Sequence, residues 1–180
     1  MARAEGQNLT GRGREEMNIY RIVAAPLSLW LCLLLIVLGV MMFQWLPDRF
    51  ELILLDSLWQ PERVRAAIAD MDATQRAAHI WLTSTVDVVF PIAFGLFVLG
   101  SGLRLHPAWR KQISALAMLL IGFDLLEGTV QILALTSQVD WLAAKQILTP
   151  VKLGCYLVGL VLVVLGWLRW LVLDRGRAMS

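Results

Sequence analysis

The sequence predicts an all-α, integral-membrane four-helix bundle. Residues of the AVILMFWYC set make up 58% of the 180 residues, and they occur in four runs of the roughly 20 residues that cross a bilayer. The chain also carries 16 Lys and Arg and 14 Asp and Glu, most of which must lie outside the hydrocarbon region. This composition excludes a disordered chain, a coiled coil and a small disulfide scaffold. We therefore expect the chain to be embedded in a lipid bilayer, which is its main partner.

The apolar runs predict one domain, residues 17–176, with spans at 22–46, 80–103, 113–135 and 147–172 and an outer loop at 47–79. Tryptophans stand near the ends of these runs, as in an interfacial aromatic belt: Trp45, Trp81, Trp109, Trp141, Trp167 and Trp170. Arg21 before the first run suggests a signal peptide, but the run is too long and no small-residue cleavage pattern follows. We therefore expect the first run to be retained as a span.

The distribution of basic residues predicts the orientation. Ten of them lie in the two tails and in the loop after the second span, against five in the other two loops. The positive-inside rule then places both termini in the cytoplasm. The 13 Arg against three Lys suit a GC-rich bacterial genome, and hence the inner membrane. We expect residues 1–16 to be a disordered cytoplasmic tail and residues 177–180 a short second one.

The outer loop is predicted to contain two short amphipathic helices. Apolar residues recur there at helical spacing in two stretches: Leu52, Leu55 and Trp59, then Val64, Ala67, Ile68 and Met71. Asp48 with Glu51 predicts a cap for the first stretch, and Pro61 suits the first position of the second. Asp72 with Gln75 predicts a cap for the second span. We expect both helices to lie on the outer membrane face; the alternative is a lid over a cavity.

Four ionisable residues fall inside the predicted spans: Asp87, Asp124, Glu127 and Lys152. A charge at the bilayer centre costs about 2.5–3.5 kcal/mol on insertion scales, so such residues need partners, water or a neutral form. At a rise of about 1.5 Å per residue, all four lie at the midplane or in the outer half. Desolvation and like-charge repulsion should keep at least one carboxyl group protonated, and Asp124 is the deepest.

Polar residues also repeat on one face of three spans. The three stripes are His79, Thr83 and Asp87; Asp124, Glu127 and Gln131; and Lys145, Thr149, Lys152 and Tyr156. Because the stripes share one depth, we expect one interior site. Its candidate ligand-binding or proton-carrying residues are Asp87, Asp124, Glu127, Lys152, Gln131, His79, Thr149 and Tyr156.

Two prolines within the spans predict helix kinks beside this site. Pro91 leaves the carbonyl of Asp87 without its helical donor, and Pro150 does the same for Gln146. Breaks at membrane depth are tolerated where they face protein or a watery cavity. A bland alternative remains, since membrane helices contain proline more often than soluble ones do.

Several chemistries are excluded by the residues present. No Cys and His residues cluster as zinc ligands, so no metal is predicted. No cofactor is predicted either: a bilayer separates His79 from His106, which excludes a bis-histidine haem, and there is no Gly-rich phosphate loop. A net charge of +2 without a basic patch argues against nucleic acid. Cys32 and Cys155 lie within apolar runs, and we expect them to be buried and to act as small hydrophobic side chains.

Three functions fit these features, and no catalytic residue can be assigned. The first is a pocket that binds a small or lipid-like ligand, or that carries protons. The second is an accessory subunit whose membrane-protein partner, or second copy, completes the site. The third is an enzyme with paired carboxyl groups, whose layout is similar to that of the four-helix sterol-isomerase and sigma-2-receptor modules; this first span lacks a carboxylate.

A purely structural role is the alternative to all three functions. A buried pair of Lys152 with Glu127 or with Asp87 would then fix the helix register without any chemistry.

Overall fold

The described residues of the computed structural model, 17–105, 107–169 and 171–172, contain helices and turns but no strand. Residues 17–23 are helical, and the α-helices that follow them are α2 (Pro26–Phe50), α3 (Pro61–Asp70), α4 (Ala73–Leu105), α5 (Arg110–Leu135) and α6 (Lys145–Arg169). Three short 3-10 turns join them: η1 (Leu55–Ser57), η2 (Pro107–Trp109) and η3 (Leu142–Ala144). The tails predicted at 1–16 and 177–180 lie outside the described residues.

Within the described part of the chain, four helices are long and apolar enough to cross a membrane: α2, α4, α5 and the segment Leu142–Arg169, which includes α6. The protein is thus an all-α bundle of the multi-pass membrane class, as the sequence predicts. The first of these helices begins at Pro26, because the chain leaves the helical conformation just before it. Ala25 is extended, with φ −64° and ψ 144°, as expected for a residue that precedes proline.

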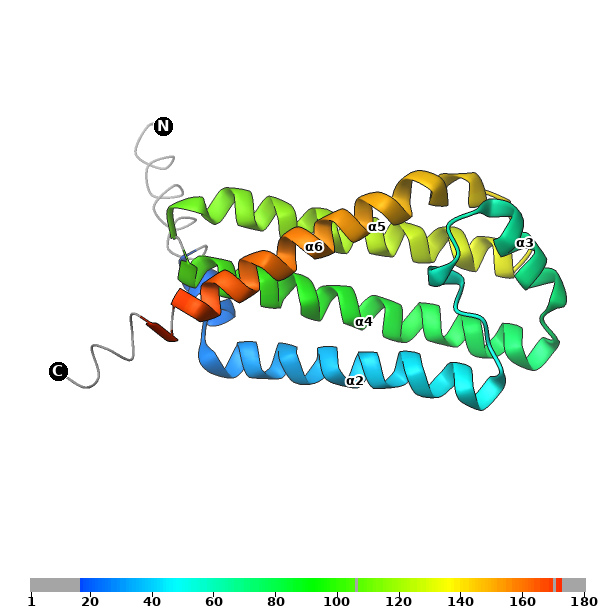
Figure 1. Cartoon of the computed structure of the whole chain (residues 1–180), viewed down its shortest axis with the longest axis horizontal. Helices are drawn as coiled ribbons and strands as arrows, with labels where there is room; N and C mark the ends of the chain where they lie inside the picture. The colour runs from blue at the N-terminus through cyan, green and yellow to red at the C-terminus, as the bar shows by residue number, and fades with distance from the viewer. Residues whose placement is uncertain (1–16, 106, 170, 173–180) are drawn as a thin grey trace, which may run out of the picture.

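Helix α4 is the centre of the bundle and packs against α2, α5 and α6 (Figure 1). Glycines allow the closest approaches. A Cβ atom on Gly166 of α6 would lie 2.6 Å from the carbonyl oxygen of Ser101, and one on Gly100 would lie 2.6 Å from that of Val23. The backbones therefore touch at the end of the bundle where α4 and α6 finish, as small residues allow in membrane helix pairs.

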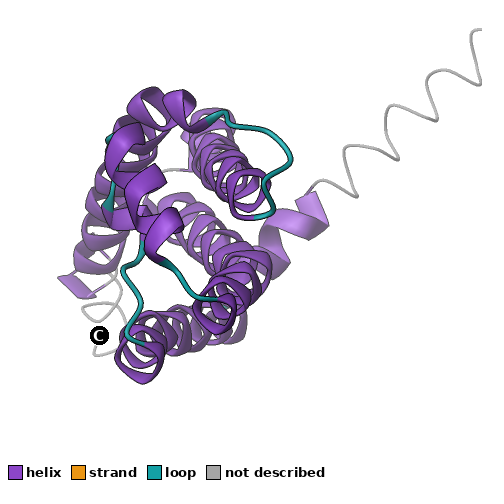
Figure 2. Cartoon of the chain, turned by 90° about the vertical axis from the view of Figure 1, so that its right-hand side faces the viewer, coloured by secondary structure: helices purple, strands orange, loops and turns teal. Residues whose placement is uncertain are grey.

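The connecting segment, residues 51–72, lies across the opposite end of the bundle (Figure 2). Helix α2 continues through Pro47 as far as Phe50, so Asp48 lies within a helix and caps nothing. The left-handed conformation of Glu51, with φ 52°, then ends α2. The first predicted loop helix is accordingly shorter than expected and consists only of η1.

The second predicted loop helix is present as α3, which begins at Pro61. The predicted cap of the following helix is also confirmed. The backbone N–H of Gln75 donates to the side-chain Oδ1 of Asp72 at 2.8 Å, and the backbone N–H of Asp72 donates to the side-chain Oε1 of Gln75 at 3.1 Å. These reciprocal bonds form a capping box at the start of α4.

Apolar packing holds the connecting segment against the bundle. Leu55 is fully buried, and it lies in a core of α3, α5 and η3 side chains made of Val64, Ile68, Val130, Leu135 and Leu142. Arg76 of α4 donates hydrogen bonds to the carbonyl oxygens of Ile68 and Leu135, at 3.0 and 3.2 Å. The segment is therefore a packed part of the bundle, which differs from a pair of helices resting on the membrane surface.

Candidate functional site

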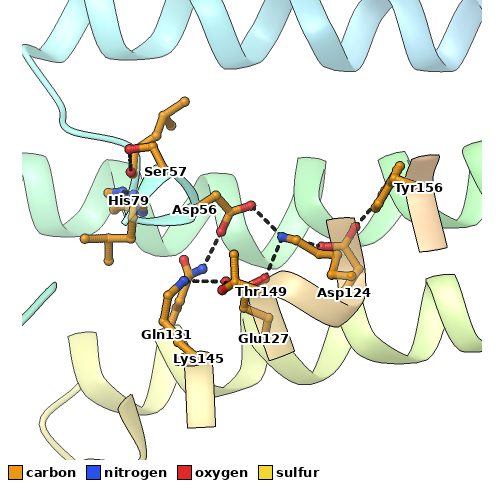
Figure 3. A network of polar contacts seen from close by, with 12 residues as sticks. Asp56, Ser57, His79, Asp124, Glu127, Gln131, Lys145, Thr149 and Tyr156 are labelled. Carbon is orange, nitrogen blue, oxygen red and sulfur yellow. Dashed lines mark hydrogen bonds and ion pairs between the residues drawn. The ribbon is translucent and has the colours of Figure 1, made fainter. Parts of the chain in front are cut away.

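Five charged side chains meet inside the bundle, between α5, α6 and η1 (Figure 3). We call them the charge cluster: Asp56, Asp124, Glu127, Lys145 and Lys152. Each helix contributes two of them from one face, because Asp124 and Glu127 are three residues apart and the lysines are seven apart. The predicted polar faces of α5 and α6 therefore do meet.

Glu127 lies at the centre of the cluster and is fully buried. Its Oε1 accepts hydrogen bonds from Nζ of Lys145 at 2.5 Å and from the Thr149 hydroxyl at 2.6 Å. Its Oε2 lies 2.6 Å from Nζ of Lys152. One carboxylate thus joins three residues of α6 that span two turns of that helix.

Lys152 is shared among three carboxylates. Besides Glu127, its Nζ lies 3.1 Å from Oδ1 of Asp124 and 3.3 Å from Oδ2 of Asp56. The contacts with Asp124 and Asp56 are hydrogen bonds, whereas the contact with Oε2 of Glu127 is an ion pair, and that oxygen has no hydrogen bond among the described residues. The single positive charge of Lys152 is therefore shared by three carboxylates.

Neutral side chains complete the contacts of the two aspartates. The Tyr156 hydroxyl donates to Oδ2 of Asp124, and the side-chain amide of Gln131 donates to Oδ1 of Asp56. The other amide atom of Gln131, Oε1, is buried and has no hydrogen-bond partner among the described residues. The predicted candidates Gln131, Thr149 and Tyr156 all belong to this network.

Asp87 is a fourth carboxyl group beside the cluster and is buried on the inward face of α4. Its charge interacts with those of Asp56, Asp124 and Lys152. Counting Asp87, four carboxyl groups share one interior with two lysines. If all were ionised, the site would carry an excess of two negative charges.

His79 differs from the other candidates, because its ring contacts the connecting segment instead of the cluster (Figure 3). Its Nε2 lies 3.3 Å from the amide nitrogen of Leu55 and 3.2 Å from the carbonyl oxygen of Ile53. One tautomer accepts the Leu55 N–H and the other donates to Ile53. Either bond fixes the backbone next to Asp56, so His79 positions the segment.

Asp56 is the contact between the cluster and the aqueous end of the bundle. Its side chain is 32% exposed, whereas those of Glu127 and Lys145 are fully buried. Burial opposes the charged form of Asp56, but the charge of Lys152 and the hydrogen bond from Gln131 outweigh it and lower its pKa. Asp56 is therefore an anion at neutral pH, held by groups that lie deeper in the bundle.

Aromatic rings lie on the other side of the cluster. The ring of Tyr156 packs against Phe94 of α4, with 4.8 Å between centroids, and stacks on Phe90 at 6.2 Å. Farther along α4 and α6 the core is apolar and includes Phe97, Val98 and Val163. The polar contacts of the cluster thus lead toward the connecting segment and end at Tyr156 in the opposite direction.

The two span prolines lie next to this site in the chain. Pro91 is buried within α4, one turn after Asp87, and α4 continues past it to Leu105. Pro150 is exposed on α6, immediately after Thr149, and α6 likewise continues. The kinks predicted at these residues stay a prediction.

Sequence reasoning missed two members of the cluster, Asp56 and Lys145. Lys145 belonged to the predicted stripe on α6 but was counted with the loop charges because it stands at the start of that helix. Asp56 falls in the predicted outer loop, 47–79, and outside the polar stripes from which the candidates were drawn. Its signal is local: it is the only charged residue between Glu51 and Glu62, within an otherwise mostly apolar stretch.

Comparison of the chain with protein-family models, with curated proteins and with solved structures finds no match. The geometry of the charge cluster is therefore the basis for assigning a function.

Proposed function

We propose that this multi-pass membrane protein binds and releases protons at the charge cluster, exchanging them through Asp56 with one aqueous face. The observation that carries the proposal is the shared ammonium group of Lys152, whose Nζ lies within 3.3 Å of oxygens on Asp56, Asp124 and Glu127. One cation cannot neutralise three anions. The remaining charge in a low-dielectric interior is most simply removed by protonating a carboxyl group.

The count of charges supports protons as the ligand. Lys145 and Lys152 provide two positive charges against four carboxyl groups, and both lysines are already in direct contact with carboxylates. Asp124 and Asp87 are the carboxyl groups to which we assign the bound protons, because Glu127 is held by both lysines.

One-sided access follows from the same contacts. Asp56 is partly exposed at the end of the bundle, and the rings of Tyr156, Phe90 and Phe94 lie on the other side of the cluster. Protons therefore enter and leave past the connecting segment. A complete transfer across the membrane would need a second state in which these rings separate.

Infrared spectroscopy of the purified protein tests the proposal directly. In lipid nanodiscs at neutral pH, we expect a C=O stretching band of a protonated carboxyl group that shifts in D2O and disappears on alkaline titration. Asp124→Asn and Asp87→Asn should each weaken this band. Asp70→Asn, which changes an exposed carboxylate at the end of α3, is the matched control and should leave it unchanged. A wild-type spectrum without such a band would contradict proton binding.

A second candidate function, binding of a lipid-like ligand, is favoured by an apolar cavity of about 220 Å³ between α2 and α4. Phe90 forms part of its wall and stacks on Tyr156, which in turn donates a hydrogen bond to Asp124. An acyl chain in this cavity would be separated from Asp124 of the charge cluster by two stacked aromatic rings, those of Phe90 and Tyr156. The cavity thus offers a site from which a membrane amphiphile could approach the cluster.

Native mass spectrometry tests this second candidate. If a lipid occupies the cavity, wild-type protein should retain it and Leu38→Trp should lose it, because Leu38 lines the cavity. Leu34→Trp is the matched control, since Leu34 is similarly exposed on α2 and lies outside the cavity lining. Equal retention by both variants would exclude the cavity as the lipid site.

We propose that both termini lie on the cytoplasmic side of a bacterial inner membrane and the connecting segment outside, because the basic residues are more numerous in the tails and in the loop after the second span. Single-cysteine variants in the connecting segment test this. An impermeant maleimide should label Ser57→Cys in intact cells, in a background where Cys32 and Cys155 are replaced by alanine.

A further inference from the structure

A second cavity lies at the same end of the bundle, outside the charge cluster. Its volume is about 300 Å³, and α3, α4 and the turn between α5 and η3 line it. The lining includes two arginines, Arg65 and Arg76, with Ser137, Gln138 and a single carboxylate, Asp140. The connecting segment contains five acidic and two basic residues, yet none of its acidic residues lines the cavity.

Arg65 is fixed in place on one wall. Its Nε donates to Oδ2 of Asp140 at 2.7 Å, a bond that connects α3 to the turn before η3. This bond lowers the pKa of Asp140 and raises that of Arg65, so both are charged at neutral pH. Glu62, one turn earlier on α3, lies 3.7 Å from Nη1 of Arg65 and outside the cavity lining.

Arg76 is fixed by neutral acceptors. Its Nη1 and Nη2 donate to the carbonyl oxygens of Leu135 and Ile68, and no carboxylate pairs with it in the part of the chain that the structure describes. With Asp140 balanced by Arg65, the charge of Arg76 leaves the cavity with one net positive charge. A guanidinium group that is oriented but not neutralised is a good partner for an anion.

The position of the cavity corresponds to the headgroup region of a bilayer. Its lining comes from the ends of the spans, where α4 begins and α5 ends. Trp141, beside Asp140 and 60% exposed, and Trp59, 55% exposed, are the aromatic residues typical of this level. Phosphate groups are the anions that are concentrated there.

We propose that this cavity binds a phosphate group, held between Arg65 and Arg76 with Ser137 and Gln138 as neutral donors. The group belongs either to the head of an anionic phospholipid or to a soluble phosphate compound, and both present the same oxygens to the arginines. Asp140 limits the affinity, because it shares Arg65 with the incoming anion. Its removal should therefore strengthen binding, which a purely structural role for the ion pair would not predict.

The test is a binding titration of the purified full-length protein in an uncharged detergent, with thermal unfolding followed by tryptophan fluorescence. Sodium phosphate should raise Tm beyond sodium chloride at equal ionic strength, with the logarithmic dependence on concentration that binding to the folded state alone gives. Asp140→Asn should lower the apparent Kd for phosphate about two- to fivefold, and Arg65→Gln should raise it by a similar factor. Glu62→Gln is the matched control and should leave this Kd unchanged.

A second arm identifies the source of the phosphate. Short-chain phosphatidylglycerol should saturate the site at lower concentration than inorganic phosphate if a lipid is the natural ligand, and at higher concentration if a soluble compound is. The proposal is overturned if chloride gives the same rise in Tm as phosphate. It is equally overturned if Asp140→Asn and Glu62→Gln have the same Kd. Each Kd is derived from the rise in Tm of a variant above its own Tm without phosphate, so a variant that is merely less stable does not mimic weaker binding.

Discussion

Oε2 of Glu127 lies 2.6 Å from Nζ of Lys152, while its other oxygen lies 2.5 Å from Nζ of Lys145. One carboxylate of α5 thus contacts two lysines of α6 in the interior of the bundle. Breaking a buried ion pair leaves an uncompensated charge in a low-dielectric medium. The stability of the α5–α6 pair should therefore depend on this one residue.

Glu127→Gln should destabilise the protein by about 3–5 kcal/mol, because the amide leaves Lys145 without a carboxylate. The measurement is unfolding in mixed detergent micelles. The double variant Glu127→Gln with Lys145→Met should recover part of the loss, since it removes the unpaired cation as well. If the losses of stability in Glu127→Gln and in Lys145→Met, each measured alone, add up to the loss in the double variant, the contact between these residues contributes nothing to stability.

Asp56→Asn should destabilise the protein at neutral pH by about 1–2 kcal/mol, because the amide lacks the charge that Lys152 and Gln131 hold. The pKa of Asp56 is lowered in the folded state, so its contribution is complete above the unfolded value of about 4 and is lost as pH falls below it. The difference in Tm between wild type and variant should accordingly vanish in acid. Asp70→Asn, the exposed control, should show no such pH-dependent difference.

His79→Ala should loosen the connecting segment at a cost of about 1–3 kcal/mol, because a buried backbone group of Leu55 or Ile53 loses its partner. Hydrogen exchange of the Leu55 amide should accelerate, and proteases should cut the segment near η1 sooner. Unchanged exchange at Leu55 would show that apolar packing alone holds the segment.

Gly166→Ala should separate α6 from α4 at a cost of about 1–3 kcal/mol, because the new Cβ would lie 2.6 Å from the backbone oxygen of Ser101. Gly154→Ala is the matched control on the same helix, where a Cβ meets nothing within 4 Å. That change should be neutral or stabilising, because alanine favours a helix by up to about 1 kcal/mol over glycine. Equal Tm values for the two variants would contradict the close packing.

The sequence predicts the spans well because each depends on local composition and length. The polar faces of α5 and α6 are predicted for a related reason, since a helical period of 3.6 residues places Asp124 beside Glu127 and Lys145 beside Thr149 and Lys152. The capping box of Asp72 and Gln75 is likewise a local pattern. Each of these features is determined by residues within two or three turns.

The path of the connecting segment could not be predicted in this way. Leu52, Leu55 and Trp59 have helical spacing, but a buried position for Leu55 gains more from the core of α3 and α5 than a surface helix would gain from its own bonds. The inward position of Asp56 depends on Lys152 and Gln131, which are remote in sequence. No pattern within the segment itself contains that information.

The long separation between Asp56 and its partners also constrains how the protein is made. Gln131 and Lys152 lie 75 and 96 residues further along the chain. During synthesis the ribosome releases Asp56 long before either partner has emerged. The first hairpin must therefore enter the membrane while this carboxylate stays in water, and the segment reaches its final place only after α6 has been inserted. Biogenesis of this fold ends, on these contacts, with the docking of a piece of chain that was among the first to be synthesised.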